Sequence, residues 1–209
     1  MTEVEWLHCR NPQVLLNDRL ARVRDRKLRL FACACCRRVW DLLTDPRSRQ
    51  AVETAERFAD GQATEVELRA AWETACRAAS EPRQDEVGAS LARVAYAARM
   101  AASHSPWTAA REALWETSWD VGAVLLHDIL GNPFRPVSVD PRWLKWHEKT
   151  VVHLAQALYE ERRFEDMPIL GDALEEAGCT NEHLLEHCRS PRPHVRGCWV
   201  VDLVLSKDR

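Results

Sequence analysis

Cysteine and histidine crowd together near one end of the 209-residue chain. Three cysteines and three histidines occur within residues 179–198. His183 and His187 are four residues apart, as are His194 and Cys198, so each pair would share one face of a helix and can hold one ion together. Thiolate and imidazole are the donors that a tetrahedral zinc site uses. This segment therefore predicts a candidate metal site, and the alternative is a solvent-facing histidine pair beside buried cysteines.

A second chemical candidate is the thiol of Cys33. On a helix its neighbours at four residues' distance are Arg29 and Arg37, and two guanidinium groups would favour the thiolate. This spacing predicts a reactive thiol outside the apolar seam formed by Leu28, Phe31 and Cys35. The alternative is a second apolar face packed inside a helical core.

The first forty residues are strongly basic, with nine Lys or Arg against four Asp or Glu, although the whole chain has a net charge of −3. A basic end on an acidic body is typical of nucleic-acid binding. The candidate contacts are Arg22, Arg26, Lys27 and Arg29. The favoured alternative is packing of these groups against acidic residues of the same chain, or plain solvation.

Composition places the chain among soluble globular proteins of one domain, or of one domain with a small appendage. Hydrophobic residues make up 46% and charged residues 29%, and no apolar run is long enough for a membrane span. The acidic start does not match a secretory signal, so we expect a cytoplasmic protein whose eight cysteines are mostly reduced. Most of the nine tryptophans are expected in the core.

Helix signals dominate, so the predicted fold is all-α, an irregular multi-helix globular fold. Two capping boxes begin at Thr2 and Thr64, and an N-cap residue precedes proline at Asn11, Ser105 and Asp140. The predicted helices span residues 3–9, 12–23, 26–43, 48–60, 65–80, 85–103, 106–130, 141–147, 151–162, 165–177, 181–188 and 194–205.

Two features of this pattern bear on the later segments. The last predicted helix is rich in β-branched residues, so a short C-terminal strand is the alternative. Glu112, Glu116, Asp120 and His127 would share one face of the helix predicted over 106–130, and we interpret that face as solvated.

The connection from Gly131 to Val139 contains two prolines and no helix signal. It divides the chain into an N-terminal helical body, 1–130, and a C-terminal helical piece, 131–209, expected to pack on it.

Three segments together carry a resemblance to a known family. They are DRKLRLFACACCRR at 25–38, GNPFRPV at 131–137, and the C-terminal segment with Cys179, His187, Cys188, His194 and Cys198. The chain resembles, over nearly its whole length, a large paralogous family of planctomycete proteins that has no assigned activity. Its members often carry an SMI1/KNR4-type label, but that fold is mixed α/β and residues 1–130 show no sheet pattern, so we do not carry its function over.

His183 lies outside the family-like segments, so the preferred metal ligands are Cys179, His187, His194 and Cys198, with zinc as the metal. No Gly-rich phosphate loop, serine nucleophile elbow or HExxH motif occurs. The leading functional hypothesis is a non-catalytic, cytoplasmic helical module that binds a protein partner. The alternatives are a metal-dependent enzyme using the C-terminal cluster and a weak nucleic-acid-binding protein.

Overall fold

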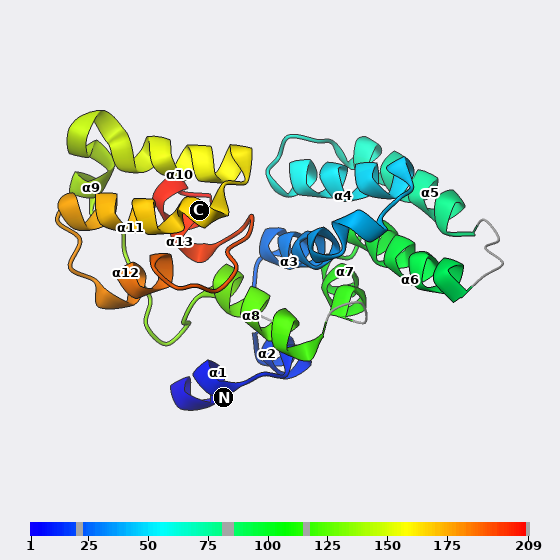
Figure 1. Cartoon of the computed structure of the whole chain (residues 1–209), viewed down its shortest axis with the longest axis horizontal. Coiled ribbons are helices and arrows are strands. Elements are labelled where there is room, and N and C mark those ends of the chain that lie inside the picture. The colour runs from blue at the N-terminus through cyan, green and yellow to red at the C-terminus, as the bar shows by residue number, and fades with distance from the viewer. Residues whose placement is uncertain (20–22, 81–85, 115–117, 208–209) are drawn as a thin grey trace. The chain divides into compact units, whose positions relative to one another are not determined.

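The computed structural model describes residues 1–19, 23–80, 86–114 and 118–207. All regular structure in these ranges is helical and no strand occurs in them, so the predicted all-α class is confirmed (Figure 1). None of the helices described is both long and apolar enough to cross a membrane.

The chain divides into two compact units. The continuous unit comprises residues 9–126, and the discontinuous unit joins residues 1–8 to residues 127–209. The sequence predicts a division near residue 131, close to the observed boundary at residue 127. It gives no sign that the first helix belongs with the C-terminal part. The packing of the C-terminal piece on the N-terminal body stays a prediction.

The continuous unit is built around one buried helix, α3. Every residue of α3 from Lys27 to Cys36 is buried, because α4, α6 and α7 all pack against it, while α5 packs against α4 and α6. The elements are α2 (Pro12–Arg19), α3 (Asp25–Arg38), the 3-10 turn η1 (Trp40–Leu42), α4 (Pro46–Ala59), α5 (Glu65–Ser80), α6 (Glu86–Ala101), α7 (Pro106–Ala113) and most of α8 (Trp119–Leu130).

The discontinuous unit packs four helices, α10 to α13, around one apolar core. α10 contacts α11 and α13, and α12 contacts α11 and α13. The core includes Trp143, Leu158, Met167 and Leu174. The elements are α1 (Glu3–His8), the end of α8, α9 (Pro141–Lys145), the 3-10 turn η3 (Trp146–Lys149), α10 (Thr150–Glu161), the 3-10 turn η4 (Phe164–Asp166), α11 (Met167–Glu176), α12 (Glu182–Cys188) and α13 (Trp199–Leu205).

Helix α1 is fixed in the discontinuous unit by one buried indole and one carboxylate. Trp6 is fully buried, and its Nε1 donates a hydrogen bond to the carbonyl oxygen of Gly131 at 3.1 Å. Glu3 accepts a hydrogen bond from Asn132 Nδ2 at 2.8 Å and pairs with Arg135. The Gly131 segment that was expected to separate two parts of the chain therefore holds the first helix.

Three predicted helices differ from the observed ones. The helix predicted over 26–43 ends at Arg38, the one predicted over 106–130 is two helices, α7 and α8, and the last helix begins at Trp199 instead of residue 194. Its residues form α13, so the alternative of a C-terminal strand is wrong. The prediction that most tryptophans lie in the core is wrong for the described residues, because only Trp6 and Trp143 are buried among them, while Trp119 is 63% exposed and Trp72 is 37% exposed. Trp115 lies outside the described residues.

Candidate metal centre

A short helix and the loop that follows it bring His187, His194 and Cys198 together. Helix α12 begins where the side chain of Asn181 accepts a hydrogen bond from the backbone N–H of Leu184 at 3.0 Å, and His187 lies in its last turn. The chain then runs through residues 189–198 without a helix and enters α13 directly after Cys198. His194 and Cys198, which are four residues apart, therefore lie in a loop. Their spacing had predicted one face of a helix.

A glycine allows α12 to lie close to α11. A Cβ atom added at Gly171 would lie 2.9 Å from Cβ of Cys188. Any residue other than glycine at position 171 would therefore push away α12, the helix that carries His187.

Asp128, near the end of α8, is the fourth member of the group. His194 Nδ1 lies 2.6 Å from Asp128 Oδ1, and His187 Nε2 lies 3.2 Å from the same oxygen. Cys198 Sγ lies 3.2 Å from His187 Nε2 and 4.0 Å from His194 Nδ1. One donor atom from each of the four residues lies within 4.8 Å of every other, so the group can hold a metal ion.

These separations are close to those of a tetrahedral site. Metal bonds of about 2.0 Å to nitrogen or oxygen and about 2.3 Å to sulfur place neighbouring ligand atoms about 3.3–3.5 Å apart. The observed distances of 2.6–4.0 Å lie on both sides of that value. The remaining separations are at most 4.8 Å, so adjustment of the side chains would bring the four atoms to tetrahedral distances.

The group is enclosed by protein. The side chains of Asp128 and His194 are each 4% exposed, that of His187 is 15% exposed, and Cys198 is fully buried. The backbone N–H of Val195 donates to Asp128 Oδ2 at 2.9 Å, which fixes the carboxylate so that Oδ1 faces the two histidines.

Burial and local charge act in opposite directions on the two acidic donors. Burial alone would raise the pKa of Asp128, but hydrogen bonds and charges of His187 and His194 outweigh it and hold that pKa below its ordinary value. Burial, reinforced by the charge of Asp128, raises the pKa of the Cys198 thiol well above its usual range. Without a metal the thiol is therefore neutral, and the carboxylate and histidines form a buried polar network.

The structure thus brings together three of the four predicted ligands and replaces the fourth. Cys179 is buried but does not belong to the group, and burial raises its pKa. Asp128 was not predicted, although one signal was present. It lies on the same helix face as the buried residue Leu125, where an acidic side chain needs a partner.

The environment of Cys33 differs from the predicted one. Cys33 is 1% exposed and its Sγ donates to the carbonyl oxygen of Val52, so the structure shows the alternative, a second face of the helix packed inside the core. The flanking guanidinium groups have other partners, because Arg29 donates to two backbone carbonyls and Arg37 pairs with Glu56. A thiol in the centre of a helix that is covered on several sides is not accessible to a reaction partner.

The basic stretch does not form the predicted nucleic-acid surface in the part that is described. Arg26 pairs with Asp60 at 3.0 Å, while Lys27 and Arg29 are buried. Arg22 lies outside the described residues. The alternative of packing against acidic residues of the same chain is therefore what the structure shows for Arg26 and Arg37.

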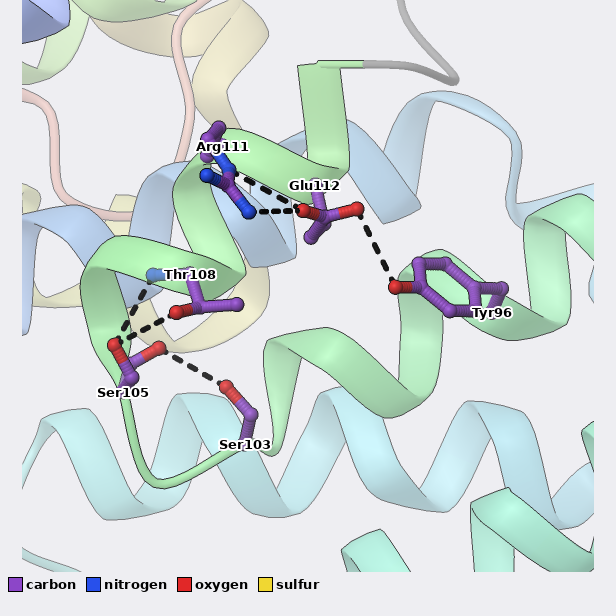
Figure 2. A network of polar contacts seen from close by, with 6 residues as sticks. All are labelled: Tyr96, Ser103, Ser105, Thr108, Arg111 and Glu112. Carbon is purple, nitrogen blue, oxygen red and sulfur yellow. Dashed lines mark hydrogen bonds and ion pairs between the residues drawn. The ribbon is translucent and has the colours of Figure 1, made fainter.

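The acidic residues predicted to share one face do not lie on one helix. Glu112 belongs to α7 and Asp120 to α8, and Glu116 lies outside the described residues. Figure 2 shows that the carboxylate of Glu112 accepts hydrogen bonds from Arg111 at 2.8 Å and from the Tyr96 hydroxyl at 3.3 Å. In the same view Ser105 caps α7 through the backbone N–H of Thr108. Glu112 therefore serves helix packing.

Comparisons with models of protein families, with curated proteins and with solved structures gave no match. Membership of the planctomycete family stays a prediction.

Proposed function

We propose that the discontinuous unit holds one structural zinc ion through Asp128, His187, His194 and Cys198, and that the protein is a non-catalytic helical binding module stabilised by it. The observation that carries this proposal is the convergence of four donor atoms of suitable type within 4.8 Å. The donors come from α8 and from residues 187–198, which are far apart in the chain, so one ion would connect α8, α12 and the segment before α13.

Zinc suits this donor set better than the common hard cations. One thiolate, two imidazoles and one carboxylate are the ligand types of protein zinc sites, whereas Mg²⁺ and Ca²⁺ select oxygen donors. Charge balance supports the same metal. A divalent cation with one carboxylate and one thiolate gives a neutral site, which lowers the cost of burying the charges.

The degree of enclosure supports a structural role over catalysis. A catalytic zinc keeps one position for water or substrate, while a structural zinc has four protein ligands. Here four protein side chains supply donor atoms, and three of them are at most 4% exposed. The enzyme alternative would require one of the four to leave the metal.

Elemental analysis of the full chain, purified without a histidine tag, tests the proposal. We expect about one zinc per chain, and we expect the Cys198→Ser and His194→Ala variants to lose it. Cys179→Ser is the matched control, since it removes another buried thiol of the same unit that lies outside the group. Metal-free protein whose melting temperature does not change with added zinc or chelator would refute the proposal and leave a buried hydrogen-bond network.

Cobalt substitution separates the structural and catalytic roles. A closed site should give the intense visible absorption of four-coordinate Co²⁺ with a sulfur-to-metal charge-transfer band, and added azide should not change it. A spectrum that shifts with azide would show an open coordination position and would favour the enzyme hypothesis.

A further inference from the structure

The continuous unit contains a cavity of about 370 Å³ that is separate from the metal centre. Its walls come from the first turns of α3 and α5, the end of α4 and the turn before α7. A volume of this size is within the range of small-molecule sites. The walls combine apolar residues (Phe58, Ala59, Leu68 and Pro106) with charged or titratable ones (Asp25, Arg26, Arg29, Glu65 and His104).

The inner wall carries the guanidinium group of Arg29, which is 3% exposed. Its Nη1 donates to the carbonyl oxygens of Ala101 and Ser103, both at 2.8 Å, and its plane lies over the ring of Phe58 at 5.1 Å. Nε and Nη2 have no hydrogen-bond partner in the described part of the chain, and neither atom is enclosed. The edge formed by Nε and Nη2 therefore presents two parallel N–H bonds to a ligand.

The charge of Arg29 lacks the direct partner that its neighbour has. Arg26, one turn earlier, donates twice to Asp60, whereas no described carboxylate lies within ion-pair distance of Arg29. Burial lowers the pKa of Arg29, which reflects the cost of keeping this cation away from water. A carboxylate binds the free edge of a guanidinium through two parallel hydrogen bonds.

The outer part of the cavity has the opposite charge. The Asp25 carboxylate is exposed and is the acidic group that stabilises the charged form of Arg29. The Glu65 carboxylate is 70% exposed and lies 3.4 Å from His104 Nδ1. A simple anion would meet Arg29 but would also be repelled by these carboxylates, whereas a ligand with an ammonium group next to its carboxylate would satisfy both charges.

We propose that this cavity binds a small zwitterion of the α-amino-acid class with an apolar side chain. The ligand carboxylate accepts hydrogen bonds from Nε and Nη2 of Arg29, and the ligand ammonium group pairs with Asp25. The side chain of the ligand packs on Phe58 and Leu68. The site shares no residue with the proposed zinc centre, so a failure of one proposal would leave the other unaffected.

Three matched compounds test this assignment by isothermal titration calorimetry with the full chain. L-Leucine carries both charges, 4-methylpentanoate lacks the amine, and 3-methylbutylamine lacks the carboxylate. We expect L-leucine to bind at least tenfold more tightly than either. No binding of L-leucine, L-valine or L-phenylalanine, or equal binding of L-leucine and 4-methylpentanoate, would overturn the proposal.

Two variants assign the groups. Asp25→Asn should weaken L-leucine about tenfold and leave 4-methylpentanoate unchanged or tighter, because it removes the ammonium partner and a repelling charge. Asp41→Asn is the matched control, as Asp41 is exposed in the same unit and does not line the cavity. Arg29→Lys should abolish measurable binding of L-leucine. Because Arg29 also supports the end of α6, the Asp25 pair decides the outcome if that variant does not fold, and equal effects of the two Asp variants would refute the assignment.

Discussion

Two adjacent arginines at the end of α3 have different surroundings. Arg37 Nε and Nη2 donate to the two carboxylate oxygens of Glu56 at 3.1 and 2.8 Å, and the Glu56 side chain is 2% exposed. The Arg37 guanidinium also lies over the ring of Trp40 at 3.7 Å. Arg38 is exposed.

Replacement of each arginine by methionine should therefore have different effects on stability. Arg37→Met leaves Glu56 buried without its main partner and should cost about 2–4 kcal/mol of unfolding free energy. Arg38→Met should change it by about 0.5 kcal/mol or less. Urea denaturation of the two variants measures the difference, and equal losses would show that the Arg37–Glu56 pair contributes little.

A second residue prediction concerns Gly131. Its φ is +65°, and an added Cβ would lie 2.9 Å from Cγ of Trp199. Gly178, in the same unit, has φ of +91° but nothing within 4 Å of an added Cβ. Both alanine variants pay for the left-handed backbone, but only Gly131→Ala also displaces an indole ring. We expect Gly131→Ala to lower the free energy of unfolding by roughly 1–3 kcal/mol more than Gly178→Ala does, as measured by chemical denaturation. Equal losses would mean that Trp199 moves at no cost.

At the scale of elements, capping chemistry determines where several helices begin. The predicted box at Thr64 is present, with the backbone N–H of Thr64 donating to Glu67 at 2.7 Å and the backbone N–H of Glu67 donating to Thr64 Oγ1 at 3.2 Å. The same arrangement joins Thr2 and Glu5. Asn11, Ser105 and Asp140 also cap the helices predicted to follow them.

Thr64→Ala should lower stability by about 1 kcal/mol, the usual effect of losing an N-cap side chain. The hydrogen bond from the Thr64 backbone is the largest cause that lowers the pKa of Glu67, and the Thr64 side chain adds to it. This contribution is present above the ordinary carboxyl pKa and is lost as pH falls through the lower folded value. Because Thr64→Ala keeps the backbone hydrogen bond, NMR titration should show the Glu67 pKa rising only part of the way toward its ordinary value. An unchanged pKa would mean that the Thr64 side chain contributes nothing to it.

Helix positions were predictable from local signals, but breaks caused by tertiary packing were not. The 65–80 prediction matches α5, because its capping box and periodicity are both local. The 106–130 prediction missed the division into α7 and α8. An added Cβ at Gly122 would lie 3.0 Å from Leu114 and 3.1 Å from Pro12, so the missing side chain accommodates residues that no local pattern places there.

The metal centre shows the same limit. His187, His194 and Cys198 could be chosen because they crowd together in the sequence, within residues 187–198. Asp128 lies 59 positions before His187, and only the packing of α8 near α12 brings them together. An acidic residue on an apolar helix face indicates that a partner exists, but it does not identify that partner.

At the scale of the whole molecule, the four proposed metal ligands all belong to one of the two units. Removal of the proposed zinc ion should therefore act locally. We expect hydrogen exchange, followed by mass spectrometry, to accelerate on chelation in residues 127–209 and in residues 1–8, while residues 9–126 keep their protection. The Cys198→Ser variant should give the same pattern without chelator. Uniform acceleration along the chain would show that the units unfold together and would contradict this prediction.

The hydrogen bond from Trp6 to Gly131 has a consequence for the order of folding. Its two residues are separated by 125 positions, so this hydrogen bond cannot form until the whole of residues 9–126 has been synthesised. The continuous unit contains its own contacts and can fold during translation as it leaves the ribosome. Helix α1, with its buried indole, must remain exposed to solvent or to a chaperone during that time. Because this contact joins residues so far apart in the chain, the docking of the first helix is one of the last steps of folding.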